Sequence, residues 1–523
     1  MSLRGNTRRL TFVLIAVAVA AINFVSMPAE FYPGDAYAIE LEAINLVRGG
    51  EFGFRKNEAD AIKSFVAVRD QYFIYNQKTG RYHNRWGAFN LGLYVIPELV
   101  NFELARTYIG NKLTADRAAI FAHNVLNCIL SVILAILLYR LAALHTRYNS
   151  LRVFLVFAVL YGSFAWNYMR AQSYEIIHLT LFTGFFYYYV VFLRGLHAAR
   201  RVTDCRSFYL YNLFLAGLCL SKTFYFFLYP VLFFPFCARL VSTGGTGIRE
   251  GLWRYRANLL RVIIPGVLTL AACLLLSWWF YGKIFLGYLQ NHPHSGAVAF
   301  SPQFIPARLH DYFVSNNRSL FVHMPLLLPG LAGFYWYARR HRYEAAFLLG
   351  AFLFCIVFFS FCYTVGEWCY GPRFFLFLLP ALCLPAAYVV EALIRQARYL
   401  ALALLAATVV LVSAVAVHAQ LEVNSRAFHL RYELAVILKR AIDMPPELTA
   451  YFDHANFAVI AGDLNTLLAG GHTGFLAETL ASYIPKGRKE EALQIVRNYL
   501  RPRFPLNYFF WRGKPAHHSR SSG

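Results

Sequence analysis

Charged residues are scarce in this chain. Asp, Glu, Lys and Arg make up 15% of the 523 residues, against roughly 25% in typical soluble domains. The acids are the scarcer kind, with 27 Asp and Glu against 50 Lys and Arg, which gives a formal net charge of +23. Together with a hydrophobic share of 58%, this composition excludes an ordinary soluble globular protein and a disordered chain.

Paired-cysteine motifs and glycine-rich phosphate loops are also missing from the sequence. No Cys-x-x-Cys pair occurs among the nine cysteines, and most of them lie inside apolar runs. This excludes a disulfide-rich secreted module and a cysteine-based zinc site, and it predicts small buried thiols. The chain has neither a G-x-G-x-x-G motif nor a Walker loop, so nothing in it predicts a nucleotide-phosphate cradle.

Long apolar runs recur instead, and they predict an all-α polytopic membrane protein. We expect about eleven transmembrane helices, of which two form a short pair broken at Ser221-Lys222-Thr223. The predicted spans are about 10–29, 117–139, 153–169, 174–193, 208–221, 223–238, 262–281, 319–337, 345–364, 374–394 and 399–419.

Arginines alternate along these spans. With the N-terminus in the cytoplasm, the cytoplasmic gaps carry twenty arginines, whereas the short outer gaps carry only Arg170, Lys222 and Arg373. This is the positive-inside pattern, and it explains most of the positive charge without a nucleic-acid partner. The first apolar run, from Thr11 to Val25 behind Arg8-Arg9, has a cleaved signal peptide as its alternative interpretation.

The topology divides the chain into a membrane module, 1–419, and an extracytoplasmic helical tail, 420–523, whose last residues we expect to be disordered. Two outer loops belong to the module: a long first loop, 30–116, with interfacial helices, and a second loop, 282–318. The first loop repeats apolar residues at helical spacing, at Tyr37, Leu41, Ile44 and Val47.

Four ionisable residues lie at the predicted outer ends of spans, where each needs a partner or a task. They are Asp35, Glu175, Lys222 and Arg373. Each has a structural alternative: a turn residue for Asp35, a local ion pair with Arg170 for Glu175, and snorkelling to headgroups for the two cations. Because the topology puts all four on one side, they predict a site where a base activates a nucleophile and cations hold a phosphate.

Five short segments stand out along the chain. They are Gly34-Asp35-Ala36-Tyr37, Gly80-Arg81-Tyr82-His83-Asn84-Arg85-Trp86-Gly87, Arg170-Ala171-Gln172-Ser173-Tyr174-Glu175, Gly217-Leu218-Cys219-Leu220-Ser221-Lys222 and Glu367-Trp368-Cys369-Tyr370-Gly371-Pro372-Arg373-Phe374. In this order they resemble motifs of the GT-C membrane glycosyltransferases that use polyprenyl-phosphate sugars. The likeness is to bacterial relatives of the protein O-mannosyltransferases and of the aminoarabinose transferase that modifies lipid A.

The resemblance implies inverting transfer of a sugar from a polyprenyl phosphate to an extracytoplasmic glycan, lipid or protein. It makes Asp35 the catalytic base, and because Ala36 stands where the family often has a second acid, that role moves to Glu175. The Lys or Arg of the family hairpin corresponds to Lys222, and we expect Lys222 to face the lipid phosphate together with Arg373. Further residues expected to bind the substrate or lipid phosphate are Arg170, His83, Arg85, Trp86 and Glu367.

Cofactors and partners follow from the same likeness. We assign no metal ligands, because His292-Pro293-His294 is too weak a signal, although some relatives carry a divalent ion. The expected partners are the lipid-linked donor, the acceptor and membrane lipids, and the expected location is the bacterial inner membrane with the site facing outward. A secondary transporter with charged broken helices and a non-catalytic scaffold subunit remain as alternatives.

Overall fold

The computed structural model describes residues 2–27, 35–56, 73–108, 112–170, 173–196, 203, 205–244, 256–284, 301–315, 319–362, 372–408, 410, 411 and 414. Helices make up nearly all of this part of the chain, and the prediction of an all-α polytopic membrane protein is confirmed. The predicted helical tail, Glu367 and the His292-Pro293-His294 segment lie outside the described residues.

Six helical segments among the described residues are long and apolar enough to cross a membrane. They correspond to six of the eleven expected spans. They are Ile120–Ala143 within α5 (Lys112–Ala143), Glu175–Gly195 (α8), Thr223–Leu240 across η3 (Thr223–Phe227) and α10 (Leu228–Gly244), Arg256–Tyr281 (α12), Arg342–Ser360 (α16), and Arg373–Arg395 across η6 (Arg373–Leu378), α17 (Leu379–Cys383) and α18 (Ala386–Arg395).

The other five expected spans are shorter helices in the described part of the chain. The segment 319–337 is broken at Met324-Pro325 into α14 (Leu320–His323) and α15 (Leu327–Arg340), because proline cannot donate to the helical ladder. The remaining four are represented by Leu10–Val25 in α1 (Ser2–Val25), α6 (Asn149–Leu160), α9 (Arg206–Ser221) and Tyr399–Thr408.

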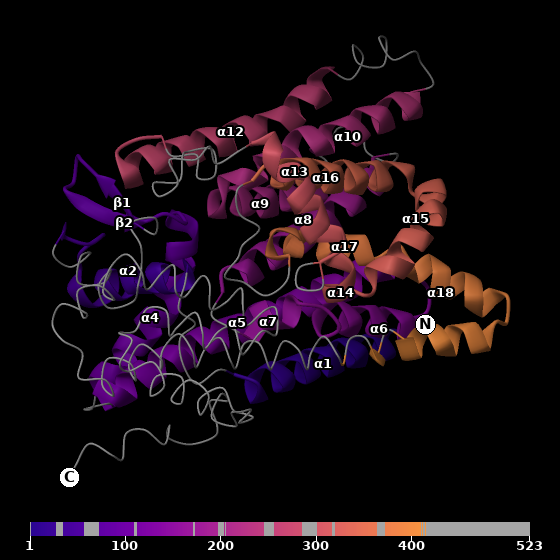
Figure 1. Cartoon of the computed structure of the whole chain (residues 1–523), viewed down its shortest axis with the longest axis horizontal. Coiled ribbons are helices and arrows are strands. Elements are labelled where there is room, and N and C mark those ends of the chain that lie inside the picture. The colour runs from indigo at the N-terminus through magenta and orange to yellow at the C-terminus, as the bar shows by residue number, and fades with distance from the viewer. Residues whose placement is uncertain are drawn as a thin grey trace, which may run out of the picture.

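Figure 1 shows the long helices α1, α5, α10, α12 and α16 running roughly along the longest axis, with α8 and α9 between them. Helix α12 lies at one edge of the bundle and α1 at the opposite edge, where α1 packs against α5 (Figure 1). The N-terminus lies at the same end of the bundle as α15 and α18 (Figure 1). That end therefore gathers the arginine-rich N-terminal segment and the arginines at the ends of α15 and α18.

The opposite end of the bundle is formed by α2 (Asp35–Gly49), by a two-stranded sheet and by α4 (Ala88–Tyr108) (Figure 1). The strands β1 (Phe73–Asn76) and β2 (Arg81–Asn84) pair antiparallel, with Phe73 opposite Asn84. Oδ1 of Asn76 accepts from the Lys78 N–H at 2.9 Å and so shapes the turn. Nδ2 of Asn76 donates to the Phe280 carbonyl at 3.1 Å, which ties the sheet to the end of α12.

A network of buried and half-buried polar groups, which we call the Glu344 cluster, lies at the α15–α18 end. It consists of His145, Arg194, His341 and Glu344. Arg194 donates from Nε to Oε1 of Glu344 at 2.8 Å and from Nη2 to Oε2 at 3.1 Å. Because the fork of the guanidinium meets both carboxylate oxygens, the cluster contains its own compensating charge.

Candidate functional site

The break in the helical chain at Lys222 is the first feature that positions the site. Helix α9 ends at Ser221 and η3 begins at Thr223, and Lys222 between them is extended, with φ −158° and ψ 115°. The carbonyl of Ser221, left without a helical partner, accepts a hydrogen bond from Nδ2 of Asn90 on α4 at 3.0 Å. The predicted interruption of the span at this lysine is therefore present, and α4 stabilises it.

The start of α8 supplies the acid. Glu175 is the first residue of the helix, where a carboxylate is favoured by the helix dipole. Its backbone N–H donates to Oγ of Ser173 at 3.2 Å, and that hydroxyl in turn donates to Oε2 of Glu175. The side chain is thereby held at the end of the helix, with Oε1 turned to another partner.

That partner is Arg373, which lies 198 residues further along the chain. Its Nη1 lies 3.4 Å from Oε1 of Glu175. Arg373 begins η6 directly after Pro372. The guanidinium carbon of Arg373 lies 5.4 Å from the centre of the Phe374 ring, and Nζ of Lys222 lies 5.6 Å from the same centre. One aromatic ring thus has both cations beside it.

A cavity joins these three groups. Glu175, Lys222 and Arg373 all line it, and its empty volume is about 320 Å³, open solvent included. Its other lining residues are His178, Phe224, Tyr225, Phe359, Phe374, Leu376 and Phe377. Aromatic rings therefore form much of the wall, and two cations and one carboxylate converge on it.

Sequence reasoning did not single out His178. It lies three residues after Glu175 on α8, so the two side chains share one face of the helix. Its ring lies 5.1 Å from the ring of Tyr174 and 5.2 Å from that of Tyr225, measured between centroids. The helical spacing from a predicted acid was the signal that could have identified it.

Arg170 ends α7 (Ala165–Arg170) and is 3% exposed. Its guanidinium carbon lies 5.1 Å from the centre of the Trp166 ring. Glu175 pairs with Arg373, and the described residues that line the cavity do not include Arg170. A role for Arg170 in binding the lipid phosphate stays a prediction.

Asp35 is the first residue of α2, so the expected helix after the first span is present. The position of its side chain lies outside what the structure describes. The role of Asp35 as the base therefore stays a prediction, and so does that of Glu367.

The segment that contains His83, Arg85 and Trp86 runs from β2 into α4. His83 is 1% exposed, and its Nδ1 lies 2.8 Å from Oε1 of Glu42 on α2. Oε2 of Glu42 accepts from the backbone N–H of Asn84 at 2.8 Å and from its Nδ2 at 2.6 Å. Glu42 thus fastens the sheet to α2, and a role for His83 in binding substrate stays a prediction.

Trp86 lies beside the residue that precedes α8. Its ring centre lies 6.4 Å from that of Tyr174, the residue before Glu175. Arg85, next to it, is half-buried. Gly87 follows with φ +89°, a conformation that glycine adopts without strain, and a Cβ there would meet the Leu220 carbonyl at 3.4 Å. The turn before α4 therefore lies close to the end of α9.

The same end of the molecule carries two more ionic features. Arg81 on β2 donates to Oε2 of Glu51 at 3.1 Å, and hydrogen bonds from Arg81 and then from Arg55 lower the pKa of Glu51. In the part of the chain that the structure describes, one group of three side chains has ligand atoms close enough together to hold a metal ion. These side chains are Glu40, Glu98 and His123.

No family model matches the sequence, and no curated protein sequence is significantly similar to it. Among solved structures, the chain is similar to the oligosaccharyltransferase of Archaeoglobus fulgidus in the apo form, with a TM-score of 0.48 and 11% identity. That match covers 84% of this chain and 59% of the archaeal one, so the chain spans about three fifths of that protein's length.

The same archaeal enzyme, AglB, in complex with an inhibitory peptide and a dolichol-phosphate matches with a TM-score of 0.43 and 12% identity, over 93% of this chain and 60% of that one. ArnT from Cupriavidus metallidurans bound to undecaprenyl phosphate matches with a TM-score of 0.44 and 14% identity, over 94% of this chain and 74% of that one. The resemblance named from the sequence motifs is thus met again among solved structures. At TM-scores below 0.5 none of these likenesses decides the function.

Proposed function

We propose that the protein is an integral membrane glycosyltransferase that transfers a sugar, with inversion, from a polyprenyl-phosphate donor to an extracytoplasmic acceptor. The observation that supports this most directly is the convergence of Lys222, Arg373 and Glu175 on one cavity. Three segments far apart in the sequence contribute these groups, so the cavity depends on the whole bundle. Two cations beside an apolar aromatic wall suit a ligand with a phosphate head and a hydrocarbon tail.

In the proposed reaction, an acceptor oxygen or nitrogen attacks the anomeric carbon, and the bond from that carbon to the phosphate oxygen breaks. Negative charge builds up on the leaving polyprenyl phosphate, and Lys222 and Arg373 stabilise it. The proton of the acceptor passes to a carboxylate, for which Asp35 is the candidate base. Because Oε1 of Glu175 is already engaged by Arg373 at 3.4 Å, Glu175 suits the orientation of Arg373 better than proton abstraction.

The orientation that goes with this proposal puts the N-terminus in the cytoplasm of a bacterial cell and the cavity on the outer side of the inner membrane. A lipid-linked donor suits such a site, because the sugar arrives activated without any nucleotide. The arginine bias of the gaps supports the orientation.

Binding of undecaprenyl phosphate to the purified full-length protein in detergent tests the first step. We expect Lys222→Met and Arg373→Gln each to weaken binding about 10- to 100-fold, since a hydrogen bond to a charged group contributes about 1.5–3 kcal/mol. Arg373→Lys keeps the charge and should recover part of the loss. Arg395→Gln, which removes an exposed arginine that pairs with the buried Glu391, is the control and should bind like the wild type.

Transfer itself needs a second assay, in which the protein is incubated with a bacterial extract of lipid-linked sugars and acceptors. Asp35→Asn should abolish covalent transfer while undecaprenyl phosphate still binds. Wild-type protein that binds no lipid phosphate, or the same affinity in Lys222→Met, would overturn the proposal. Binding without transfer in any extract would favour a scaffold, and sugar flux into vesicles without transfer would favour a transporter.

A further inference from the structure

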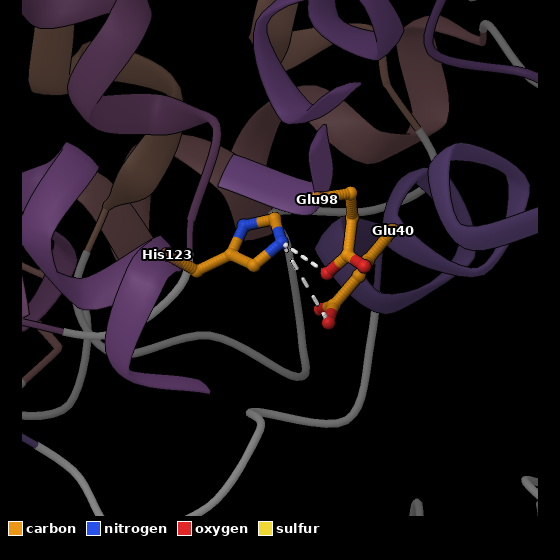
Figure 2. A group of neighbouring side chains, drawn as sticks. All are labelled: Glu40, Glu98 and His123. Atoms are coloured by element: carbon orange, nitrogen blue, oxygen red, sulfur yellow. Dashed lines mark hydrogen bonds and ion pairs between the residues drawn. The ribbon is translucent and has the colours of Figure 1, made fainter. Parts of the chain in front are cut away.

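A second cluster of ionisable groups lies outside the cavity, where three helices meet. Glu40 comes from α2, Glu98 from α4 and His123 from α5, and their side chains point toward one another (Figure 2). All three are buried: both glutamates are 0% exposed and the histidine is 2% exposed. Their ligand atoms all lie within 4.8 Å of one another.

The electrostatics of this cluster call for a cation. Two buried carboxylates, when ionised, repel each other, and each also loses the free energy of its hydration. Arg48 reaches the cluster from one side, with Nη2 3.7 Å from Oε2 of Glu98, but its side chain is 36% exposed. Among the residues that the structure describes, none donates a hydrogen bond to that Oε2 atom, although it is buried.

The Glu344 cluster at the other end of the bundle gives an internal comparison. It also combines buried carboxylate with histidine, but there the fork of Arg194 meets both oxygens of Glu344, at 2.8 and 3.1 Å. In that cluster a side chain supplies the compensating charge. At Glu98, the guanidinium of Arg48 stays beyond hydrogen-bond distance of the carboxylate oxygen.

The distances within the cluster fit a bound ion. Nε2 of His123 lies 3.1 Å from Oε1 of Glu98 and 3.8 Å from Oε1 of Glu40. Ligand atoms that surround a tetrahedral zinc ion at about 2.0–2.1 Å lie about 3.4 Å from one another. The two observed separations bracket this value, so small side-chain movements would bring all three atoms to bonding distance.

We propose that Glu40, Glu98 and His123 form a divalent metal site that takes Zn²⁺. One imidazole with two carboxylates is a donor set that suits zinc, whereas Mg²⁺ and Ca²⁺ favour oxygen ligands alone. Three protein ligands leave one position of a tetrahedral ion open. The ring of Tyr94 lies 5.1 Å from that of His123 and shields the site on that side.

The site would fasten together the elements that frame the cavity. The ion joins α2, which begins at Asp35, to α4 and α5. Along α4, Glu98 follows eight residues after Asn90, or about 12 Å, and Asn90 holds the Ser221 carbonyl next to Lys222. The metal therefore acts as a structural link behind the cavity, and its presence does not depend on whether the protein transfers sugars.

The test is the metal content of the full-length protein, purified in detergent without added metal or histidine tag and measured by mass spectrometry. We expect about one equivalent of zinc, or its uptake after stripping with a chelator and dialysis against ZnCl₂. Zinc should raise the temperature of thermal unfolding of the stripped protein, whereas Mg²⁺ and Ca²⁺ at the same concentration should not.

Variants identify the ligands. Glu98→Gln and His123→Gln should each lower the zinc content to below about one tenth of an equivalent and abolish the zinc-dependent rise in unfolding temperature. The matched control is Glu42→Gln, which changes an equally buried glutamate that also faces a histidine, His83, and it should keep its zinc. Stripped wild type that neither binds zinc nor gains stability from it, or undiminished zinc content in both ligand variants, would overturn the proposal.

Discussion

The Glu344 cluster makes stability depend on pH, with a sign that the structure fixes. Burial, and then the charge of Arg194, lower the pKa of His341 from 6.5 to about 4 and lower the pKa of His145 well below its ordinary value. In the unfolded chain both histidines titrate near 6.5. The unfolded chain therefore binds more protons below that pH, and stability is lost as the pH falls from about 6.5 to about 4.

The magnitude follows from linkage. A histidine with a pKa of 6.5 when unfolded and about 4 when folded costs about 1.3 kcal/mol of unfolding free energy between pH 7.5 and pH 5.5. The pKa of His145 is lowered well below 6.5 by burial and by Arg194, so this histidine adds to the loss in the same direction. Unfolding of the detergent-solubilised protein by heat or denaturant at the two pH values measures the loss.

Replacing Arg194 with Met should reverse the direction in which the Glu344 cluster makes stability change with pH. At pH 7.5 the variant leaves the buried carboxylate of Glu344 without its guanidinium partner. We expect a cost of about 2–3 kcal/mol, below the roughly 3–5 kcal/mol of a fully buried pair, because Arg194 is 33% exposed. Without Arg194, the histidines, each 3.6 Å from an oxygen of Glu344, can take up a proton as the pH falls.

The variant should therefore recover part of its stability at pH 5.5, while the wild type loses stability. Other buried histidines contribute to the wild-type pH dependence, but they contribute equally to the variant, so the difference between the two isolates the cluster. Arg395→Gln serves as the control for a lost arginine at the same end of the bundle. If wild type and Arg194→Met lose the same stability between the two pH values, the reasoning is refuted.

Two further predictions concern stability, measured by thermal unfolding in detergent. A Cβ at Gly333 on α15 would lie 2.0 Å from the Pro385 carbonyl oxygen, so Gly333→Ala should lower the free energy of unfolding by about 1–3 kcal/mol or more. The control is Gly92→Ala, where a Cβ meets nothing within 4 Å, and it should stabilise the protein by up to about 1 kcal/mol. Equal unfolding temperatures of the two variants would contradict the close approach at Gly333. Glu42→Gln turns an amide donor toward the donors of Asn84 and should cost about 1–3 kcal/mol; an unchanged unfolding temperature would show that the fastening of the sheet to α2 is unimportant.

Local sequence signals predicted the membrane architecture and part of the site. Apolar runs located the six long spans, because the length of a hydrophobic run is set by the bilayer and needs no tertiary information. The pair of short runs around Lys222 predicted the break there, and a charge count predicted which helix ends share a side. That Lys222, Arg373 and Glu175 line one cavity agrees with this shared side, although side chains at one end of a bundle need not meet.

Other features depend on packing that no local pattern encodes. The metal-type cluster draws one residue from each of α2, α4 and α5, and the intervals of 58 and 25 residues between them match no ligand motif. One signal was present: Glu98 stands in the apolar stretch from Leu91 to Val100, where an acid needs a partner. The partners of Glu98 are determined only when the helices pack, so the sequence predicts that a partner exists but not which residue it is.

The two clusters lie far apart along α5, and this placement leads to a last prediction. His123 lies within α5 and His145 two residues beyond its end, so about 30 Å of helix separates them. Sites so far apart, with no shared partner, should contribute independently to stability. Stripping zinc should therefore lower the unfolding temperature of wild type and of Arg194→Met by the same amount when both are measured at one pH. A chelator effect that disappears in Arg194→Met would mean that the ion binds at the Glu344 cluster and not between Glu40, Glu98 and His123.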